Sequence, residues 1–556
     1  MKQLILIALS LALACTQIPP LSAAEAKPVK KAKKANPATV AKNQKAAADF
    51  FAGPIRRLKI TFTPEQLAKL SKDERNYAEA TISEATATGA TPGQKVMVKL
   101  KGSTGTFQNL GRRPSLTLNF DKPEGGTRFH GMKKIHLNNA VQDHTFLAEL
   151  MAGEVARKAG VPASRCTQAF VEINGRDVGI YVVKESFTKD FLSAFYKNPN
   201  GDLYDGGSYK EIHEGMEKDQ GDPKDNAALK ELIAACQDKD PDPAKRWERL
   251  NKILDVEKYM KFTALESVVC HWDGYNYFNH NNYRIYRDPD TGKFSFIMHG
   301  MDNCFGDENF SMVPSFKLPR GPMVGAALMS CPQGPPMYWA AAKSAYEAIK
   351  KENWAARVEF AGTRLRDAIA EKDPARATNY YEKTVKQAML RIPRRIANVG
   401  RQVQEPFKPF FIEKAGVKVP KTWVLDTSTG GKGDIVKLDG RTCLHLVSTG
   451  TGVPAWKQKI QLEAGRYRMG SIVGVLGVES NEDEHGRGGG LWVTGASKRS
   501  NVLEGDGGFH PGEAGGQSMG YEFETKGGEV ELVFELRAKK GEVWLALDNF
   551  GMNRGE

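Results

Sequence analysis

The sequence predicts a chain of mixed α+β structure that ends in an all-β sandwich. With 556 residues it is too long for one hydrophobic core, so we expect more than one folding unit. Strand-like segments come first, helical periodicity follows, and short β-type segments with Gly-rich turns fill the last quarter. Apolar residues make up 40% and charged residues 26% of the chain, which excludes a wholly disordered or collagen-like protein.

Residues 1–24 have the pattern of a secretory signal peptide. An early Lys is followed by an apolar stretch from Leu4 to Ala14 and by small residues ending at Ala24. We therefore expect an exported protein, in the periplasm, at the cell surface or outside the cell. Lipidation at Cys15 is the less favoured alternative. No later segment has 18 consecutive apolar residues, so we expect no transmembrane span.

Residues 25–48 are expected to form a solvated Lys/Ala-rich tether. Positions 27–47 hold seven lysines and no acidic residue, which is about half of the net charge of +13. Nucleic-acid-binding domains usually gather their cations on a folded face with stacking aromatic residues, and positions 27–47 contain none. The sequence thus predicts no specific nucleic-acid partner.

A first domain is expected over residues 49–405, beginning with strands. Thr63 starts a short helix, Asp143 is the expected N-cap of a helix over about 145–159, and Asn174-Gly175 is a strong hairpin turn. The predicted strands of this part are 60–62, 95–101, 115–120, 134–137, 169–173 and 179–183. Further helices are expected at 187–195, 226–264 and 338–401, with a two-stranded hairpin at 283–286 and 294–298 between them.

Residues 406–420 are expected to be a linker, and residues 421–556 a β-sandwich accessory domain that resembles carbohydrate-binding jelly-roll modules. Its Trp456 and Trp492 would stack on sugars if exposed, and would fill the core if buried. Burial is the favoured interpretation, which leaves carbohydrate or cell-surface contact as an alternative.

Cysteine and histidine spacing argues against a zinc site. The six cysteines after the signal segment are widely spaced and form no CxxC pair, so buried free thiols are favoured over disulfides. Any disulfide is most plausible among the four cysteines between positions 236 and 331. The histidines share no metal-ligand spacing, and no GxSxG motif predicts a serine hydrolase.

The segment 271–306, HWDGYNYFNHNNYRIYRDPDTGKFSFIMHGMDNCFG, is the most unusual in the chain. Asp273 lies in a loop, four asparagines follow, and Asp302 comes just after the hairpin. Two carboxylates and a carboxamide arranged in this way suit phosphoryl transfer, since one Asp aligns a hydroxyl and the other groups hold Mg²⁺. Asp and Asn also populate turns for conformational reasons, and on spacing alone that alternative is favoured.

Several ordered motifs from about Gln94 to Asp307 resemble the spore-coat CotH kinase family, a divergent branch of protein-kinase-like proteins. The motifs are KLKGSTGTF, RRPSLTLNF, GMKKIHLNNAVQDHTFLAELMAGEVARKAGVPAS, VEINGRDVGIYVVKESFTKDFL, GDLYDGG and the 271–306 segment. The resemblance implies an atypical, two-lobed protein-kinase-like domain that uses ATP and Mg²⁺. With this resemblance, a phosphoryl-transfer site becomes the favoured interpretation of segment 271–306, in place of Asp and Asn residues that only form turns.

The resemblance also implies roles for single residues. Asp273 becomes the catalytic aspartate, and Asn282 and Asp302 the metal ligands, with Asn279 as second choice for the amide. Relatives often carry Trp-Asp-x-Asp where this chain has His299-Gly300-Met301-Asp302, so the first Asp is replaced by Gly300.

On the nucleotide side, the resemblance implies a cation at Arg113. Glu149 is expected to hold that cation, with a solvent-facing Glu as the equal alternative, and Glu185 is expected near the adenine, at the hinge between the lobes.

The function expected from this resemblance is transfer of the ATP γ-phosphoryl group to a Ser or Thr hydroxyl of a protein substrate. The alternative is an inactive surface adhesion or scaffold protein that keeps the fold, favoured by Gly300 and by the sandwich domain. A carbohydrate-directed protein is a third option, which depends on exposure of Trp456 and Trp492.

Overall fold

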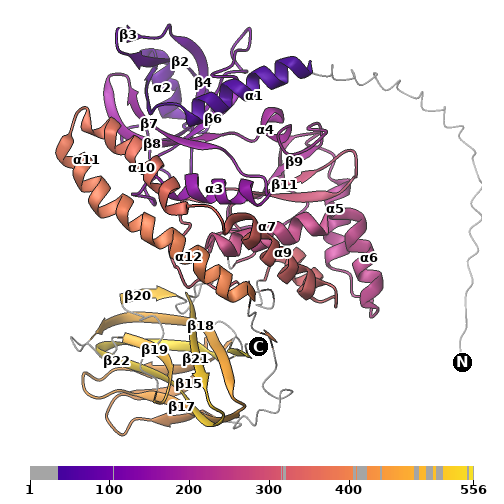
Figure 1. Ribbon diagram of the computed structural model, residues 1–556, viewed down its shortest axis with the longest axis vertical. Helices are drawn as coiled ribbons and strands as arrows, with labels where there is room; N and C mark the ends of the chain where they lie inside the picture. The colour runs from indigo at the N-terminus through magenta and orange to yellow at the C-terminus, as the bar shows by residue number, and fades with distance from the viewer. Residues whose placement is uncertain are drawn as a thin grey trace, which may run out of the picture.

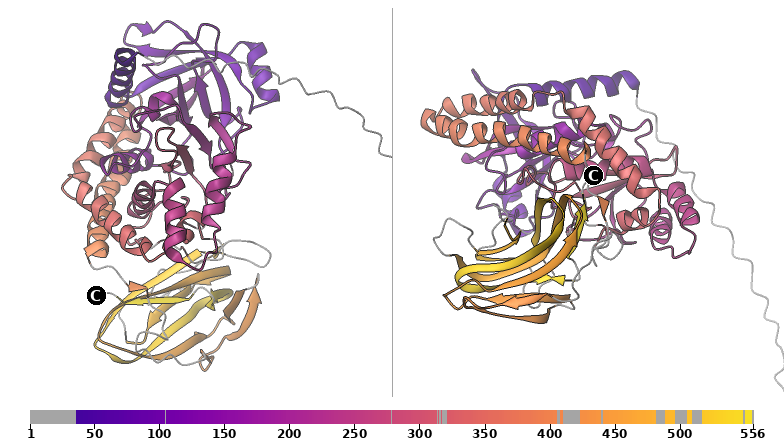
Figure 2. Two further views of the ribbon diagram at one scale, coloured as in Figure 1. Left: turned by 90° about the vertical axis from the view of Figure 1, so that its right-hand side faces the viewer. Right: turned by 60° about the horizontal axis from the view of Figure 1, so that its bottom comes forward.

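Three large hydrophobic cores organise the part of the chain that the structure describes. This computed structural model describes residues 36–103, 105–277, 279–312, 314, 316, 321–404, 408–409, 423–438, 441–480, 488–495, 505–508, 517–547 and 550–554. A β-rich part lies at one end, helices lie in the middle, and a β-sandwich lies at the other end (Figures 1 and 2). The mixed α+β composition is therefore confirmed. The expected signal peptide and most of the expected linker lie outside the described residues.

The N-terminal β-rich part is a sheet that closes on itself. Its strands are β1 (Arg56–Thr61), β2 (Ala78–Thr86), β3 (Gly89–Ala90), β4 (Gln94–Lys101), β5 (Ser115–Asn119), β6 (Lys134–Asn138), β7 (Cys166–Ile173) and β8 (Arg176–Glu185). The order is β1-β7-β8-β6-β5-β4-β2, and β1 pairs again with β2, which makes a barrel. Alternate residues of β4, namely Val96, Val98 and Leu100, point into its core, as period-two alternation predicts.

Helix α1 (Pro37–Ala52) occupies much of the segment that we expected to be a tether. Asn36 caps it by accepting a hydrogen bond from the Ala38 amide at 2.9 Å, and Pro37 is at its start. Phe50 and Phe51 are buried in the barrel core, so the helix is anchored to the folded part. The tether prediction was wrong for residues 37–48 because Lys/Ala composition conceals these two anchors.

The helical part packs around a second, four-stranded sheet of order β10-β9-β11-β12. The strands of this sheet are β9 (Asp202–Asp205), β10 (Glu217–Gln220), β11 (Tyr283–Arg287) and β12 (Phe294–Met298). Helix α2 (Pro64–Lys72) belongs to the barrel. The other helices are α3 (Ala148–Lys158), α4 (Lys189–Leu192), α5 (Ala227–Cys236), α6 (Pro243–Ile253), α7 (Val256–Val268), α8 (Met323–Met329), α9 (Gly334–Ile349), α10 (Trp354–Ala370), α11 (Pro374–Tyr380), a π-helical turn η1 (Tyr381–Val385) and α12 (Lys386–Gln404). Helix α7 is buried over most of its length and carries the site loop at its end.

Two predicted helices are shorter than expected. Helix α3 begins at Ala148, although Asp143 does accept a hydrogen bond from the Ala148 amide at 2.9 Å. The same carboxylate also accepts the Thr145 amide, which holds the intervening residues in a turn before the helix starts. Within 187–195, only Lys189–Leu192 is α-helical.

The C-terminal part is an antiparallel β-sandwich. Its strands are β13 (Lys408–Pro409), β14 (Val424–Asp426), β15 (Lys432–Leu438), β16 (Arg441–Val447), β17 (Ala455–Leu462), β18 (Gly465–Ser480), β19 (Gly488–Val493), β20 (Gly505–Gly508), β21 (Gln517–Thr525), β22 (Gly528–Ala546) and β23 (Gly551–Arg554). Strand β22 pairs with β17 and β19 through its first half and with β16 and β18 through its second, so it belongs to both layers. Trp456 is buried and donates its indole N–H to the His445 carbonyl at 3.0 Å, which confirms the core interpretation for that residue. Trp492 is partly buried against the same core.

All six cysteines of the described residues are free, as expected. Among the described helices, none combines the length and the apolar character needed to cross a bilayer.

Candidate functional site

The loop that follows α7 is folded back over the end of that helix by Glu266. The buried Glu266 carboxylate accepts hydrogen bonds from the amides of Tyr275 (2.8 Å) and Asn276 (3.0 Å) and from the Asn276 side chain (2.7 Å). A Cβ at Gly274 would lie 2.4 Å from Glu266 Oε1, so this approach requires glycine. Burial raises the pKa of Glu266 to about 8.

Three asparagine side chains converge on Asp273. Asn279 donates to Asp273 Oδ1 at 2.7 Å, and Asn281 and Asn282 donate to Oδ2 at 3.2 and 2.8 Å. Asn282 also donates to the Asp273 carbonyl at 3.0 Å. A carboxylate has about four acceptor positions, so one on Oδ1 is left for a further donor such as a hydroxyl. The crowded asparagines therefore position the carboxylate.

Gly300 packs directly against Asn282. A Cβ at position 300 would lie 2.1 Å from Asn282 Oδ1, and Gly300 has a φ of +56°. Both features oppose any side chain here, so the aspartate that relatives often carry does not fit beside this Asn282 rotamer. His271 Nε2 also meets the His299 carbonyl at 2.9 Å. These two contacts bring the Asp273 loop and the turn that carries Asp302 together.

A buried ion pair lies on the barrel side of that turn. Lys184 of β8 bonds Glu149 of α3, and both side chains are only 1% exposed. Lys184 Nζ also lies 3.0 Å from His299 Nδ1, which links the pair to the turn. Burial alone would raise the pKa of Glu149, but the Lys184 ammonium outweighs burial and holds this pKa below its usual value. Burial lowers the pKa of His299 well below its usual range, so the imidazole is neutral beside Lys184.

A second lysine approaches the same cluster. Lys101 at the end of β4 donates to Asn138 Oδ1 at 2.5 Å, and Asn138 donates to Glu149 Oε2 at 2.9 Å. Burial, followed by the positive charge of Lys184, lowers the pKa of Lys101 to about 8. Cations from two strands of the barrel thus face the carboxylates of the helical part.

Asp302 is partly buried near these charges. Burial and the negative charge of Glu149 raise its pKa to about 6. No cluster of three or more His, Cys, Asp or Glu among the described residues could hold a metal alone. Asp302 and Asn282 Oδ1 nevertheless offer hard oxygen donors, and Mg²⁺ commonly takes one or two carboxylates with water and phosphate oxygens completing its shell. The residues therefore fit Mg²⁺ bound together with a phosphate ligand.

Arg113 lies elsewhere, which corrects its expected pairing with Glu149. Its guanidinium donates to the Ile180 carbonyl and lies over the ring of Tyr181, 5.3 Å from the ring centroid. The cation that Glu149 holds is Lys184, and the expected alternative of a solvent-facing Glu149 is also wrong. A lysine inside the apolar strand GIYVVKE was the available signal.

Glu185 points away from Lys184, as neighbouring residues of a strand do. It accepts two hydrogen bonds from Arg165, at 2.8 Å from Nε and 2.5 Å from Nη2. Arg165 also reaches Gln44 of α1 at 3.2 Å. Contacts thus connect Asp273 to Asn282 and, through the 299–300 turn, to Lys184 and Glu149. Asp302 follows two residues after Gly300, whereas Arg113 and Glu185 make other contacts.

Comparison with known proteins finds two kinds of similarity. Residues 98–359 match the CotH kinase protein family. Invasin CotH2 of Rhizopus delemar is 26% identical over 188 residues, 31% of this chain and 32% of that protein. Inner spore coat protein H of Bacillus subtilis is 24% identical over 210 residues, 35% of this chain and 55% of that protein. The match thus spans about a third to a half of these relatives.

Among solved structures, TmCBM61 in complex with β-1,4-galactotriose is similar to 24% of this chain and 89% of that chain, with 18% identity and a TM-score of 0.17.

Proposed function

Because residues 98–359 belong to the CotH kinase protein family, we propose that this chain is an exported kinase that transfers the ATP γ-phosphoryl group to a Ser or Thr hydroxyl of a protein. The observation that carries the proposal is the line of contacts from Asp273 through Asn282 and Gly300 to His299, Lys184 and Glu149. It joins a positioned carboxylate to a buried lysine–glutamate pair. In this proposal the barrel and the helical part are the two lobes of a kinase-like domain.

The proposed chemistry assigns each group a separate task. Asp273 aligns the acceptor hydroxyl through the open position on Oδ1 and accepts its proton as the phosphoryl group moves. Lys184 and Lys101 supply positive charge toward the triphosphate, and Glu149 fixes Lys184. Asn282 and Asp302 would hold Mg²⁺, which supplies charge neutralisation on the phosphates when bound.

The test is nucleotide binding and phosphoryl transfer by the full chain. Wild type, Asp273→Asn and Asp302→Asn are compared by calorimetry with ATP and Mg²⁺, and by transfer of labelled phosphate onto the chain itself and onto an acceptor protein. We expect Asp273→Asn to bind ATP but to lose about 10²- to 10⁴-fold in transfer rate, because the aligning base is gone. Asp302→Asn should lose the Mg²⁺ dependence of ATP binding.

Asp290→Asn is the matched control, since Asp290 lies in the exposed turn of the same hairpin. Among the contacts described, its carboxylate accepts a hydrogen bond only from the Asn198 side chain, and its backbone amide donates to the Asp288 carboxylate. Its binding and transfer should equal those of wild type. Wild type without saturable ATP binding would refute the kinase proposal.

A surface-adhesion or scaffold role is the second candidate. It is favoured by Gly300, which leaves no room for a carboxylate at that position, and by the names of the relatives, an invasin and a spore coat protein. Under this candidate the buried charges only stabilise the fold. Saturable ATP binding that depends on Asp302 separates the two proposals.

A further inference from the structure

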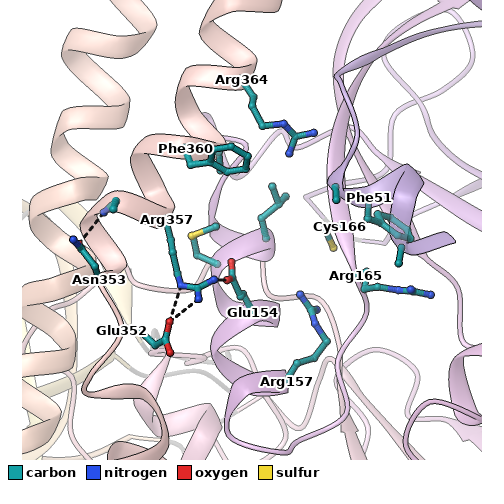
Figure 3. A pocket seen from close by; sticks show the side chains of 16 residues that line it. Phe51, Glu154, Arg157, Arg165, Cys166, Glu352, Asn353, Arg357, Phe360 and Arg364 are labelled. Atoms are coloured by element: carbon teal, nitrogen blue, oxygen red, sulfur yellow. Dashed lines mark hydrogen bonds and ion pairs between the residues drawn. The ribbon is translucent and has the colours of Figure 1, made fainter. Parts of the chain in front are cut away.

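A cavity of about 640 Å³ lies on a different face of α3 from Glu149. Its walls come from α1, α3, the start of β7 and α10 (Figure 3). Leu150, Glu154 and Arg157 of α3 line it, at helical spacings i, i+4 and i+7, while Glu149 faces Lys184. The cavity is therefore separate from the site described above.

The cavity has more cations than carboxylates. Its lining includes four arginines and two glutamates. Arg357 is paired with both glutamates, Glu154 and Glu352, in an ion-pair network that Figure 3 shows. Arg165 is paired with Glu185, which does not line the cavity.

Arg157 and Arg364 have no carboxylate within ion-pair distance among the described residues. Arg157 donates to the Ser164 carbonyl at 2.5 Å, and Arg364 donates to the Gly53 carbonyl. Burial lowers the pKa of both guanidinium groups, which nevertheless stay charged because the ordinary pKa of arginine is so high. Two partly buried positive charges thus lack a counter-charge of their own.

Apart from Asn353, the rest of the lining is apolar and includes an exposed aromatic ring. Phe51 and Met151 are buried, whereas Phe360 is 65% exposed. The Arg364 guanidinium lies 5.7 Å from the Phe360 ring centroid. An exposed phenylalanine beside an arginine without a carboxylate presents an apolar surface and a positive charge to the same ligand.

We propose that this cavity binds a small amphipathic anion, with its carboxylate or phosphate head at Arg364 and its apolar body between Phe360 and Phe51. Arg157 adds positive charge deeper in the cavity. The proposal does not depend on kinase activity, because none of these residues belongs to the Asp273 site.

The test uses four probes with the full chain, by naphthalene fluorescence and calorimetry. 2-Naphthoate and 2-naphthyl phosphate each carry an anionic head group and an apolar body, and comparing them distinguishes a carboxylate from a phosphate head group. 2-Naphthol has the apolar body without a carboxylate or phosphate, and inorganic phosphate has the anion without an apolar body. We expect saturable one-site binding of at least one naphthyl anion, about tenfold or more tighter than 2-naphthol and inorganic phosphate. Excess ATP with Mg²⁺ should not displace it.

Arg364→Gln should weaken binding by about tenfold, because it removes the charge that pairs with the head group. Arg366→Gln is the matched control: Arg366 is on the same helix, is paired with Asp367 and does not line the cavity. Phe360→Ser is a second test variant, because an exposed side chain can be replaced without unfolding the helix. It should also weaken binding. The proposal is overturned by absence of saturable binding of both anions, by equal binding of 2-naphthol, by displacement with ATP, or by retained affinity in both Arg364→Gln and Phe360→Ser.

Discussion

Lys184 and Glu149 form an ion pair with each side chain only 1% exposed, between the last barrel strand and helix α3. Asn138 satisfies the second carboxylate oxygen and His299 contacts the ammonium, so the pair is part of a hydrogen-bonded network. Such a network ties the barrel to the helical part and makes removal of either partner costly, because the other charge is left buried.

Lys184→Met should lower the free energy of unfolding by about 3 to 5 kcal/mol, because it strands the buried Glu149 carboxylate. The double variant Lys184→Met/Glu149→Leu should be less destabilised than that, since neither charge remains. Urea unfolding followed by circular dichroism measures both. Lys261→Met is the control, since Lys261 forms a surface pair with Glu257 in which the side chains are 35% and 74% exposed, and it should change stability by less than about 0.5 kcal/mol. If Lys184→Met and Lys261→Met lower the free energy of unfolding equally, the buried pair contributes no more to stability than the surface pair.

Gly300→Asp should destabilise the chain by about 2 kcal/mol or more, from its positive φ and from contact with Asn282. Gly160→Asp separates these causes, because Gly160 has a φ of +81° but nothing within 4 Å of an added Cβ. That control should lose only about 1 kcal/mol. Thermal unfolding of both variants, and of Gly300→Asp combined with Asn282→Gly, measures the contact. Failure of Asn282→Gly to recover stability would contradict the packing explanation.

The stability contributed by Lys101 should rise with pH. Its folded-state pKa is lowered to about 8, so between pH 8 and its ordinary pKa the unfolded chain binds more protons than the folded one. The free energy of unfolding of wild type relative to Lys101→Met should therefore increase by about 2 kcal/mol from pH 7.5 to 10. Urea unfolding at several pH values gives this difference, in which other groups cancel. Lys95→Met, at an exposed position of the same strand, is the matched control for replacing a lysine of β4 by methionine.

Local patterns predicted most elements of the fold, but closure of the barrel depends on long-range pairing. The alternation in β4 and the Asn174-Gly175 turn, with φ values of +46° and +80°, are written in neighbouring residues. The pairing of β1 with both β2 and β7 cannot be predicted from neighbouring residues, because it joins segments far apart in sequence. Strand β22 likewise continues through Gly541, which has a φ of +109°, although a glycine between two β-type segments usually indicates a turn.

The same distinction applies to the site. Asp273, Asn282 and Asp302 come from one 30-residue segment, and the structure brings Asp273 and Asn282 into contact beside Gly300. The cation was assigned to Arg113, whereas Lys184 pairs with Glu149 although 35 positions separate them. A charged residue in an apolar strand indicates burial, but the sequence alone does not say which acid it meets.

Under the proposed function, two asparagines of the loop have different roles: Asn279 positions Asp273, and Asn282 binds the metal. Asn279 contacts Asp273 Oδ1, the oxygen with an open acceptor position, whereas Asn282 has its Oδ1 free of the bonds to Asp273. Asn279→Ala should therefore lower kcat with unchanged Mg²⁺ requirement, because Asp273 loses orientation but no ligand is removed. Asn282→Ala should raise the Mg²⁺ concentration needed for half-maximal rate.

Steady-state kinetics at a series of Mg²⁺ concentrations makes this comparison, with circular dichroism as the check on folding. Asn198→Ala is the control, since Asn198 bonds Asp290 outside the loop. If Asn279→Ala raises the Mg²⁺ requirement and Asn282→Ala does not, then Asn279 is the amide ligand, and the contacts of Asn282 with Asp273 and Gly300 serve only to shape the loop.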